Sequence, residues 1–117
     1  MSKVTFTIDS ITFSANIFDN VTSQYLLEKL PLSITMHDLN NNEKYHDFND
    51  AFPTNMQEIK HIHKGDIMLY QDSYLVIFYK SFTTTFSYTP VGTITHPDSL
   101  DVLNSISDVD ITIKSLS

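Results

Sequence analysis

Alternation of apolar with polar residues recurs along most of the chain and constrains its fold more than any other feature. Residues 4–8 alternate Val, Phe and Ile with Thr, and residues 11–17 repeat the pattern after a short Asp9-Ser10 turn. Because successive side chains of a strand point to opposite faces, a period of two is typical of a half-buried β-strand. The two segments therefore predict an N-terminal β-hairpin.

Further strands are predicted by alternation or by continuous apolar runs. The segment Leu75–Tyr79 is apolar at every position, which is typical of a central strand that is buried on both faces. Residues 46–61 are mostly polar and are expected to form a surface excursion. The remaining strands are predicted over residues 32–36, 43–45, 66–70, 74–80, 91–95 and 109–114, with extended structure over 81–89.

Two short helices are expected between the strands. Residues 21–30 carry leucines at helical spacing, Asn20 or Thr22 can cap the helix start, and a following proline ends the helix. Pro97 is expected to open the second helix, over residues 97–106, because proline is tolerated in a first turn.

The order of these elements predicts a mostly β, closed antiparallel barrel with helices over its open ends. Strands far outnumber helices, and no alternation of strand and helix points to a parallel sheet. Closure removes strand edges that would otherwise pair with other chains. The 117 residues form one domain, 1–117, which is long enough to bury a core. We expect the first and last strands to lie together, since each needs a partner.

Charge and composition exclude several classes of partner. The net charge is −7, and all seven basic residues are lysines, so the chain contains no arginine. This argues against nucleic acid and against anionic membrane surfaces, both of which attract clustered cations. The absence of cysteine removes disulfides and thiolate metal sites. No apolar run reaches the roughly 20 residues of a membrane span, and we expect a cytoplasmic protein.

His61 and His63 are the strongest candidates for a metal site. Being two residues apart, they would share one face of a strand. A zinc site needs three or four ligands, and further ligands could join only through folding. We favour the alternative that both histidines belong to a solvated approach to the strand at Gly65-Asp66, and we expect no metal and no cofactor.

Three acidic residues raise the question of acid/base catalysis. Asp38, Glu43 and Asp47 could supply paired carboxylates, but the pattern is not specific. Glu43 and Lys44 flank a predicted hairpin turn, where solvated charges are ordinary, and Asp38 is suited to cap the Asn-rich turn at residues 40–42. No Gly-x-Ser-x-Gly or glycine-rich phosphate loop is present. We therefore expect no catalytic residue.

The chain resembles the small cyclophilin-like proteins of bacteria and archaea over nearly its whole length. The matching stretches are Asp19-Asn20, Leu30-Pro31-Leu32, 36–40, 42–45, 62–70, 78–82 and 87–94. Asn41 departs from the family, which commonly has glycine in this turn, but Asn also adopts left-handed backbone angles. The resemblance implies an eight-stranded antiparallel barrel capped by two helices. It implies no settled activity.

Residues 82–88 are the most suggestive functional segment, because aromatic side chains alternate there with Thr and Ser. Such a segment can grip an extended peptide or a flat ligand. We favour the alternative, in which Phe82 and Phe86 point into the barrel while the threonines face water. Cyclophilins hold peptides on the outer face of the barrel, and the expected lining of a similar groove is Tyr45, Tyr70, Phe82, Thr84, Phe86 and Tyr88.

Two functions of different classes follow from this groove. The first is a noncatalytic domain that binds a peptide or a small molecule. The second is a divergent peptidyl-prolyl isomerase, which needs no nucleophile or cofactor. The missing arginine separates them, since the resemblance implies that cyclophilins use an arginine in the groove as their key donor.

Overall fold

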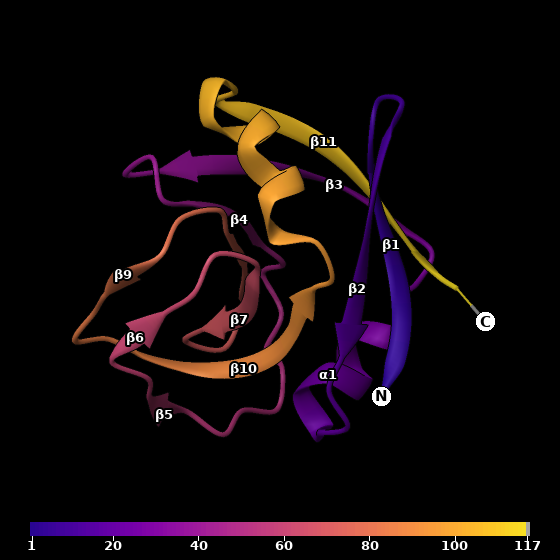
Figure 1. The fold of residues 1–117 in the computed structure, drawn as a ribbon. Coiled ribbons are helices and arrows are strands. Elements are labelled where there is room, and N and C mark those ends of the chain that lie inside the picture. The colour runs from indigo at the N-terminus through magenta and orange to yellow at the C-terminus, as the bar shows by residue number, and fades with distance from the viewer. Residues whose placement is uncertain (117) are drawn as a thin grey trace.

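Eight antiparallel strands close into a barrel in the computed structural model, which describes residues 1–116 (Figure 1). Around the barrel the order is β2-β1-β11-β3-β4-β8-β7-β10, and a β10–β2 pairing closes it. The bounds of the barrel strands are β1 Ser2–Ile8, β2 Ile11–Ile17, β3 Leu32–Leu39, β4 Glu43–Asp47, β7 Asp66–Tyr70, β8 Tyr74–Phe78, β10 Ser87–Ile94 and β11 Asp108–Ser115. The predicted fold class is confirmed.

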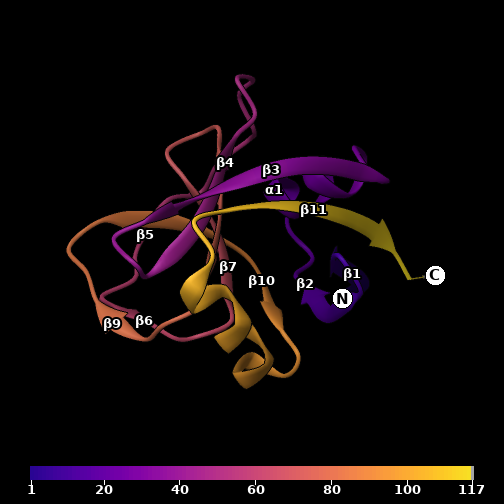
Figure 2. The same cartoon turned by 90° about the horizontal axis from the view of Figure 1, so that it is seen from above.

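Three very short strands lie outside the barrel. β5 (Gln57–Glu58) adds to β10, whereas β6 (His61–Ile62) and β9 (Phe82–Thr83) pair only with each other. In Figures 1 and 2, all three lie on the side of the molecule away from both termini. Of these, β6 and β9 contribute residues to the lining of a groove.

The first and last strands are neighbours, as the sequence predicts. β1 pairs with β11 in a register that places Phe6 opposite Ile113, and β1 also pairs with β2 in the N-terminal hairpin. Asp9, in the hairpin turn, has a φ of 52°, a left-handed angle that Asp tolerates better than most residues.

Both helices are present, with bounds that differ from the prediction. α1 covers Val21–Leu27 and is capped by Asn20, whose Oδ1 accepts a hydrogen bond from the Ser23 N–H at 2.8 Å. The second helix, η1 (Pro97–Ser105), is a 3₁₀ helix rather than an α-helix. Leu26 of α1 and Leu100 and Leu103 of η1 are buried in the barrel core, so each helix covers apolar interior. Among the described residues, no helix is long and apolar enough to cross a membrane.

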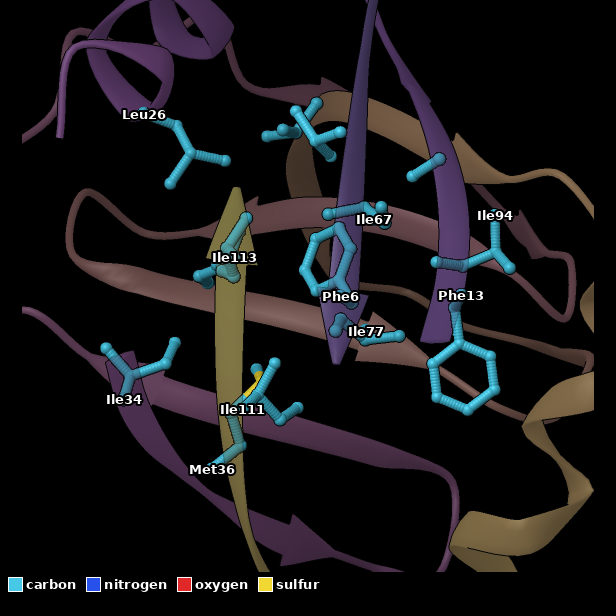
Figure 3. Packing of buried hydrophobic residues seen from close by; sticks show 14 of the residues in the cluster. Phe6, Phe13, Leu26, Ile34, Met36, Ile67, Ile77, Ile94, Ile111 and Ile113 are labelled. Carbon is cyan, nitrogen blue, oxygen red and sulfur yellow. The ribbon is translucent and has the colours of Figure 1, made fainter. Parts of the chain in front are cut away.

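The interior of the barrel is filled by the apolar members of the alternating strands. Figure 3 shows Phe6 of β1, Ile67 of β7, Ile77 of β8 and Ile113 of β11 converging on one core. Phe52 also packs into this core from the segment 46–61, together with half-buried Phe48. The segment lies largely at the surface, as predicted, but these two phenylalanines anchor it to the core.

A second, smaller apolar cluster lies on the outer face of the barrel. Its buried members are Ile62, Met68, Val76, Phe78 and Tyr88. Along β8, Leu75 and Ile77 face the interior while Val76 and Phe78 join the outer cluster. β8 is thus buried on both faces, as its continuous apolar sequence predicts.

Candidate functional site

A groove of about 780 Å³ opens beside the outer cluster. It runs from the β3–β4 turn to the start of β10, with the β6–β9 ribbon between them. Its lining is formed by Leu39, Asn40, Asn42, Glu43, Lys60, His61, Tyr70, Phe82, Thr83, Thr84, Thr85, Phe86 and Tyr88.

Four aromatic side chains form the apolar part of this lining. The Tyr70 ring lies 5.9 Å from the Phe86 ring and 5.5 Å from the Tyr88 ring. Phe82 packs 5.6 Å from Phe78 of the outer cluster. Ring separations of this size are typical of favourable aromatic pairs. The result is a continuous aromatic wall on the outside of the barrel.

Phe82 and Phe86 do not point into the barrel. Phe82 is half-buried against the outer cluster, and Phe86 is 57% exposed. The alternative interpretation of segment 82–88, in which these two rings belong to the interior, is therefore wrong. Phe86 therefore presents its ring to solvent beside the groove.

The backbone of segment 82–88 is held in place by local hydrogen bonds. The Thr84 N–H donates to the Lys60 carbonyl at 2.9 Å, and the Phe86 N–H donates to Thr84 Oγ1 at 3.1 Å. These bonds tie the loop to the β6 side of the groove. The wall is therefore held in place by bonds within the chain itself.

Five of the six predicted lining residues lie along this groove, namely Tyr70, Phe82, Thr84, Phe86 and Tyr88. Tyr45 does not. It is half-buried on the same outer face of β4, but its ring packs against His37 at 5.7 Å and Tyr74 at 6.1 Å. The β4 residue that reaches the groove is Glu43, two positions earlier, because the groove meets only that end of the strand.

Glu43 is a candidate that the sequence raised only as one of three nonspecific acids and that is absent from the predicted groove lining. Its side chain is only 8% exposed, and it pairs across β4–β8 with Phe78 of the outer cluster. Burial, together with the charge of Asp38, raises the pKa of Glu43 to about 7. The expectation of an ordinary solvated charge at Glu43 is wrong. The signal available in the sequence was its period-two relation to Tyr45, which places both side chains on one face.

Lys44 is also not solvated, contrary to expectation. It faces the barrel side of β4 and is 0% exposed. Its ammonium group bonds Asp38 Oδ1 at 2.8 Å and the carbonyl of Ile106. The Tyr79 hydroxyl also donates to Asp38 Oδ1. This cluster lies at the end of the barrel beside η1, and the carboxylate of Asp38 neutralises the charge of Lys44.

Asp38 caps the turn, as predicted. Asp38 Oδ2 accepts a hydrogen bond from the Asn41 N–H at 3.1 Å. Burial alone would raise the pKa of this carboxyl, but the hydrogen bonds from Lys44, Tyr79 and Asn41 hold its pKa below the ordinary value. Asp38 therefore stays ionised and fully partnered.

The histidine pair lies at the margin of the groove. His61 is exposed and lines one edge, while His63 is exposed in the turn that follows β6. Within residues 1–116, no group of three or more His, Asp or Glu side chains is placed to hold a metal ion. Asp47, the third acidic candidate, accepts a hydrogen bond from the Asn49 N–H at 2.9 Å in a local turn.

Comparison with known proteins agrees with this architecture. The model of the cyclophilin-like family matches residues 6–114, nearly the whole chain. The chain belongs to the cyclophilin-like family. No curated protein matches it. The resemblance inferred from the sequence is therefore confirmed, but membership of the family does not by itself assign an activity.

A solved structure of McbB in complex with tryptophan is similar in fold. The TM-score is 0.69 with 17% sequence identity, over 97% of this chain and 45% of that chain. The chain thus spans less than half the length of McbB. At this identity the likeness shows a shared fold only.

Proposed function

We propose that this domain is a noncatalytic binding module that holds a small molecule or a short peptide segment in the outer groove. The observation that carries the proposal is the preformed wall of Tyr70, Phe82, Phe86 and Tyr88. Binding sites combine an apolar lining with a few polar groups in a cavity of roughly 300–1,000 Å³. A groove of about 780 Å³ falls within this range.

The polar part of the groove supports the same function. Thr83, Thr84 and Thr85 bring hydroxyl groups, and Asn40 and Asn42 bring amides, to the rim of the aromatic wall. Hydroxyls and amides both donate and accept hydrogen bonds, so they suit the backbone of a peptide or the polar edge of a flat ligand. The complex of the McbB structure with tryptophan makes an aromatic ligand a sensible first probe.

Amide chemical-shift mapping on ¹⁵N-labelled protein tests this proposal. The probes are indole, L-tryptophan and short Ala-Pro peptides, each titrated to millimolar concentration. We expect shift changes to gather at residues 60–61 and 82–88, and to be lost in Phe86→Ala. Tyr74→Phe is a matched control on the outer face, since Tyr74 does not line the groove. Changes that gather elsewhere, or no change with any probe, would reject the groove as a binding site.

A further inference from the structure

We propose that the groove selects ligands that carry an ammonium group beside an aromatic or apolar body, and that the Glu43 carboxylate receives this group. The inference rests on the proposed binding function and narrows it to a ligand class. The starting observation is the carboxylate of Glu43, which lines the groove without an internal partner.

Glu43 is more than nine-tenths buried and lines the groove, yet its carboxylate makes no hydrogen bond or ion pair with any described residue. The other buried charges of the same region are all partnered, Lys44 with Asp38 and Asp38 with Tyr79 as well. No fully buried side-chain oxygen among the described residues lacks a hydrogen bond, so the carboxylate oxygens of Glu43 keep access to solvent in the groove. Burying most of this side chain without an internal partner still carries a desolvation cost. A cation brought by a ligand would form an ion pair with Glu43 and offset this cost.

The surroundings of Glu43 leave no internal cation to take that place. Lys44, its chain neighbour, points to the opposite face of β4 and is bonded to Asp38 and to the carbonyl of Ile106. Lys60 and His61 line the far side of the groove on the β6 segment, and neither is ion-paired with Glu43. The charged partner must therefore come with the ligand.

The rest of the groove fits the body of such a ligand. The carboxylate of Glu43 acts on Tyr88 and raises the pKa of its phenol after the larger effect of burial, so the acid and the aromatic wall lie close together. An ammonium group at Glu43 would then sit beside aromatic faces, which attract cations by about 0.5–2 kcal/mol. The net charge of −7 favours the approach of a cation over that of an anion.

Three indole compounds that differ in charge test the inference. Tryptamine carries an ammonium group, N-acetyltryptamine is neutral, and indole-3-propionate is an anion. We expect tryptamine to bind at least about tenfold more tightly than the other two at about pH 8, since hydrogen bonds to charged groups contribute roughly 1.5–3 kcal/mol. Isothermal titration calorimetry and the same amide shifts would measure the three affinities.

Glu43→Gln keeps the shape of the side chain and removes its charge. We expect this variant to lose the preference for tryptamine while it retains binding of N-acetyltryptamine. Glu58→Gln is the matched control, because Glu58 is exposed on β5 next to β10 but does not line the groove. A second readout is the ¹³C shift of the Glu43 carboxyl in the unaltered protein at about pH 6, below its pKa of about 7, which should move toward the ionised value only when tryptamine is added.

The outcomes separate the inference from the proposed function. Equal affinity for tryptamine and N-acetyltryptamine, or an unchanged preference in Glu43→Gln, would overturn the role of Glu43 and leave the binding groove intact. Failure of all three compounds to shift residues 82–88 would reject this inference together with the groove as an indole site, and the Ala-Pro peptides would then decide whether the proposed function survives.

Discussion

The ammonium group of Lys44 lies 2.8 Å from Asp38 Oδ1, although the Lys44 side chain is 0% exposed. The pair joins β4 to β3 where η1 meets the barrel, since Lys44 also bonds the carbonyl of Ile106. Taking a lysine fully out of water costs several kcal/mol, and the bonds to Asp38 and the carbonyl offset that cost.

Removing one member of this pair should therefore destabilise the fold strongly. We expect Lys44→Met to lower the free energy of unfolding by about 3 kcal/mol, because it leaves Asp38 partly buried with an uncompensated charge. The double variant Lys44→Met, Asp38→Asn should recover much of this loss. Urea denaturation of both variants measures the difference. Equal stability of the single and double variants would contradict a coupled pair.

Glu43 predicts how stability changes with pH. Its pKa is about 7 in the folded protein against an ordinary 4.5, so the folded state holds the proton more tightly than the unfolded chain. Stability therefore falls as the pH rises from about 4.5 to 7, and the shift corresponds to roughly 3 kcal/mol at most. Glu43→Gln should remove this slope and be more stable than the parent at about pH 8.

Urea midpoints at about pH 4.5, 6 and 8 measure this effect, with Glu58→Gln as the control for loss of one acidic charge. The titratable and charged groups that face Glu43 from neighbouring elements or across the groove are Asp38, Tyr79, Tyr88, Lys60 and His61. Burial and nearby groups raise the pKa of both tyrosine phenols, so they do not titrate in this window. Asp38 acts in the opposite direction, since its lowered pKa stabilises the fold at higher pH and that contribution is lost on acidification. A parent slope that persists in Glu43→Gln would assign the effect to another group.

Gly92 predicts where the barrel is least tolerant of a larger side chain. It pairs with Ile17 at the β10–β2 seam, and a Cβ there would lie 2.4 Å from the Asn16 carbonyl oxygen and 2.9 Å from Ile17 Cδ1. We expect Gly92→Ala to cost on the order of 1–3 kcal/mol, because backbone rather than a movable side chain must shift. Thermal unfolding against Ser87→Ala, an exposed change at the start of the same strand, provides the comparison.

Substitutions of Phe82 and Phe86 should affect ligand binding more than they affect the free energy of unfolding. Phe86 is 57% exposed, so Phe86→Ala should change the free energy of unfolding by less than about 1 kcal/mol. Phe82 packs on Phe78, and Phe82→Ala should cost on the order of 1–2 kcal/mol. Both variants should weaken ligand binding in the groove. A large loss of stability in Phe86→Ala would show that its ring is structural.

The barrel could be predicted from the sequence because each of its strands produces a local pattern of apolar and polar residues. Alternation identified both faces of β1 and β11, and their need for partners predicted that Phe6 and Ile113 lie on adjacent strands. The continuous apolar run of β8 predicted a strand that is buried on both faces, between the barrel interior and the outer cluster. The type of the second helix could not be predicted, since the sequence pattern at Pro97–Ser105 does not distinguish 3₁₀ from α geometry over so few residues.

The groove could be predicted only in part, because its walls come from segments far apart in the chain. The composition of residues 82–88 marked one wall. On β4, period two gave the correct face but could not tell whether Tyr45 or Glu43 meets the groove, which depends on where residues 60–61 lie. Burial of Lys44 escaped prediction for the same reason, since its partners Asp38 and Ile106 are brought to it by β3 and by the end of η1.

We predict, finally, that prolyl isomerase activity is negligible. Rotation about the peptide bond faces a barrier of about 20 kcal/mol, and a catalyst must favour the twisted state in which the proline nitrogen gains a lone pair. The resemblance to cyclophilins implies that a rigid arginine fork supplies the donors for that state, and this chain has no arginine. Lys44 cannot replace it, since it is buried behind β4, which leaves Lys60 as the one lysine among the described lining residues.

Lys60 is a poor substitute for an arginine, because its charge sits on a flexible stem and cannot hold two donors in a plane. Loss of a preorganised donor elsewhere costs about 10²–10³ in rate, and we expect a comparable deficit here. A protease-coupled assay, or exchange spectroscopy on Xaa-Pro peptides, measures the rate. Efficient acceleration that disappears in Lys60→Ala or Tyr88→Phe, but not in Tyr74→Phe, would contradict a noncatalytic role. It would instead indicate an isomerase whose donors are Lys60 and the phenol of Tyr88.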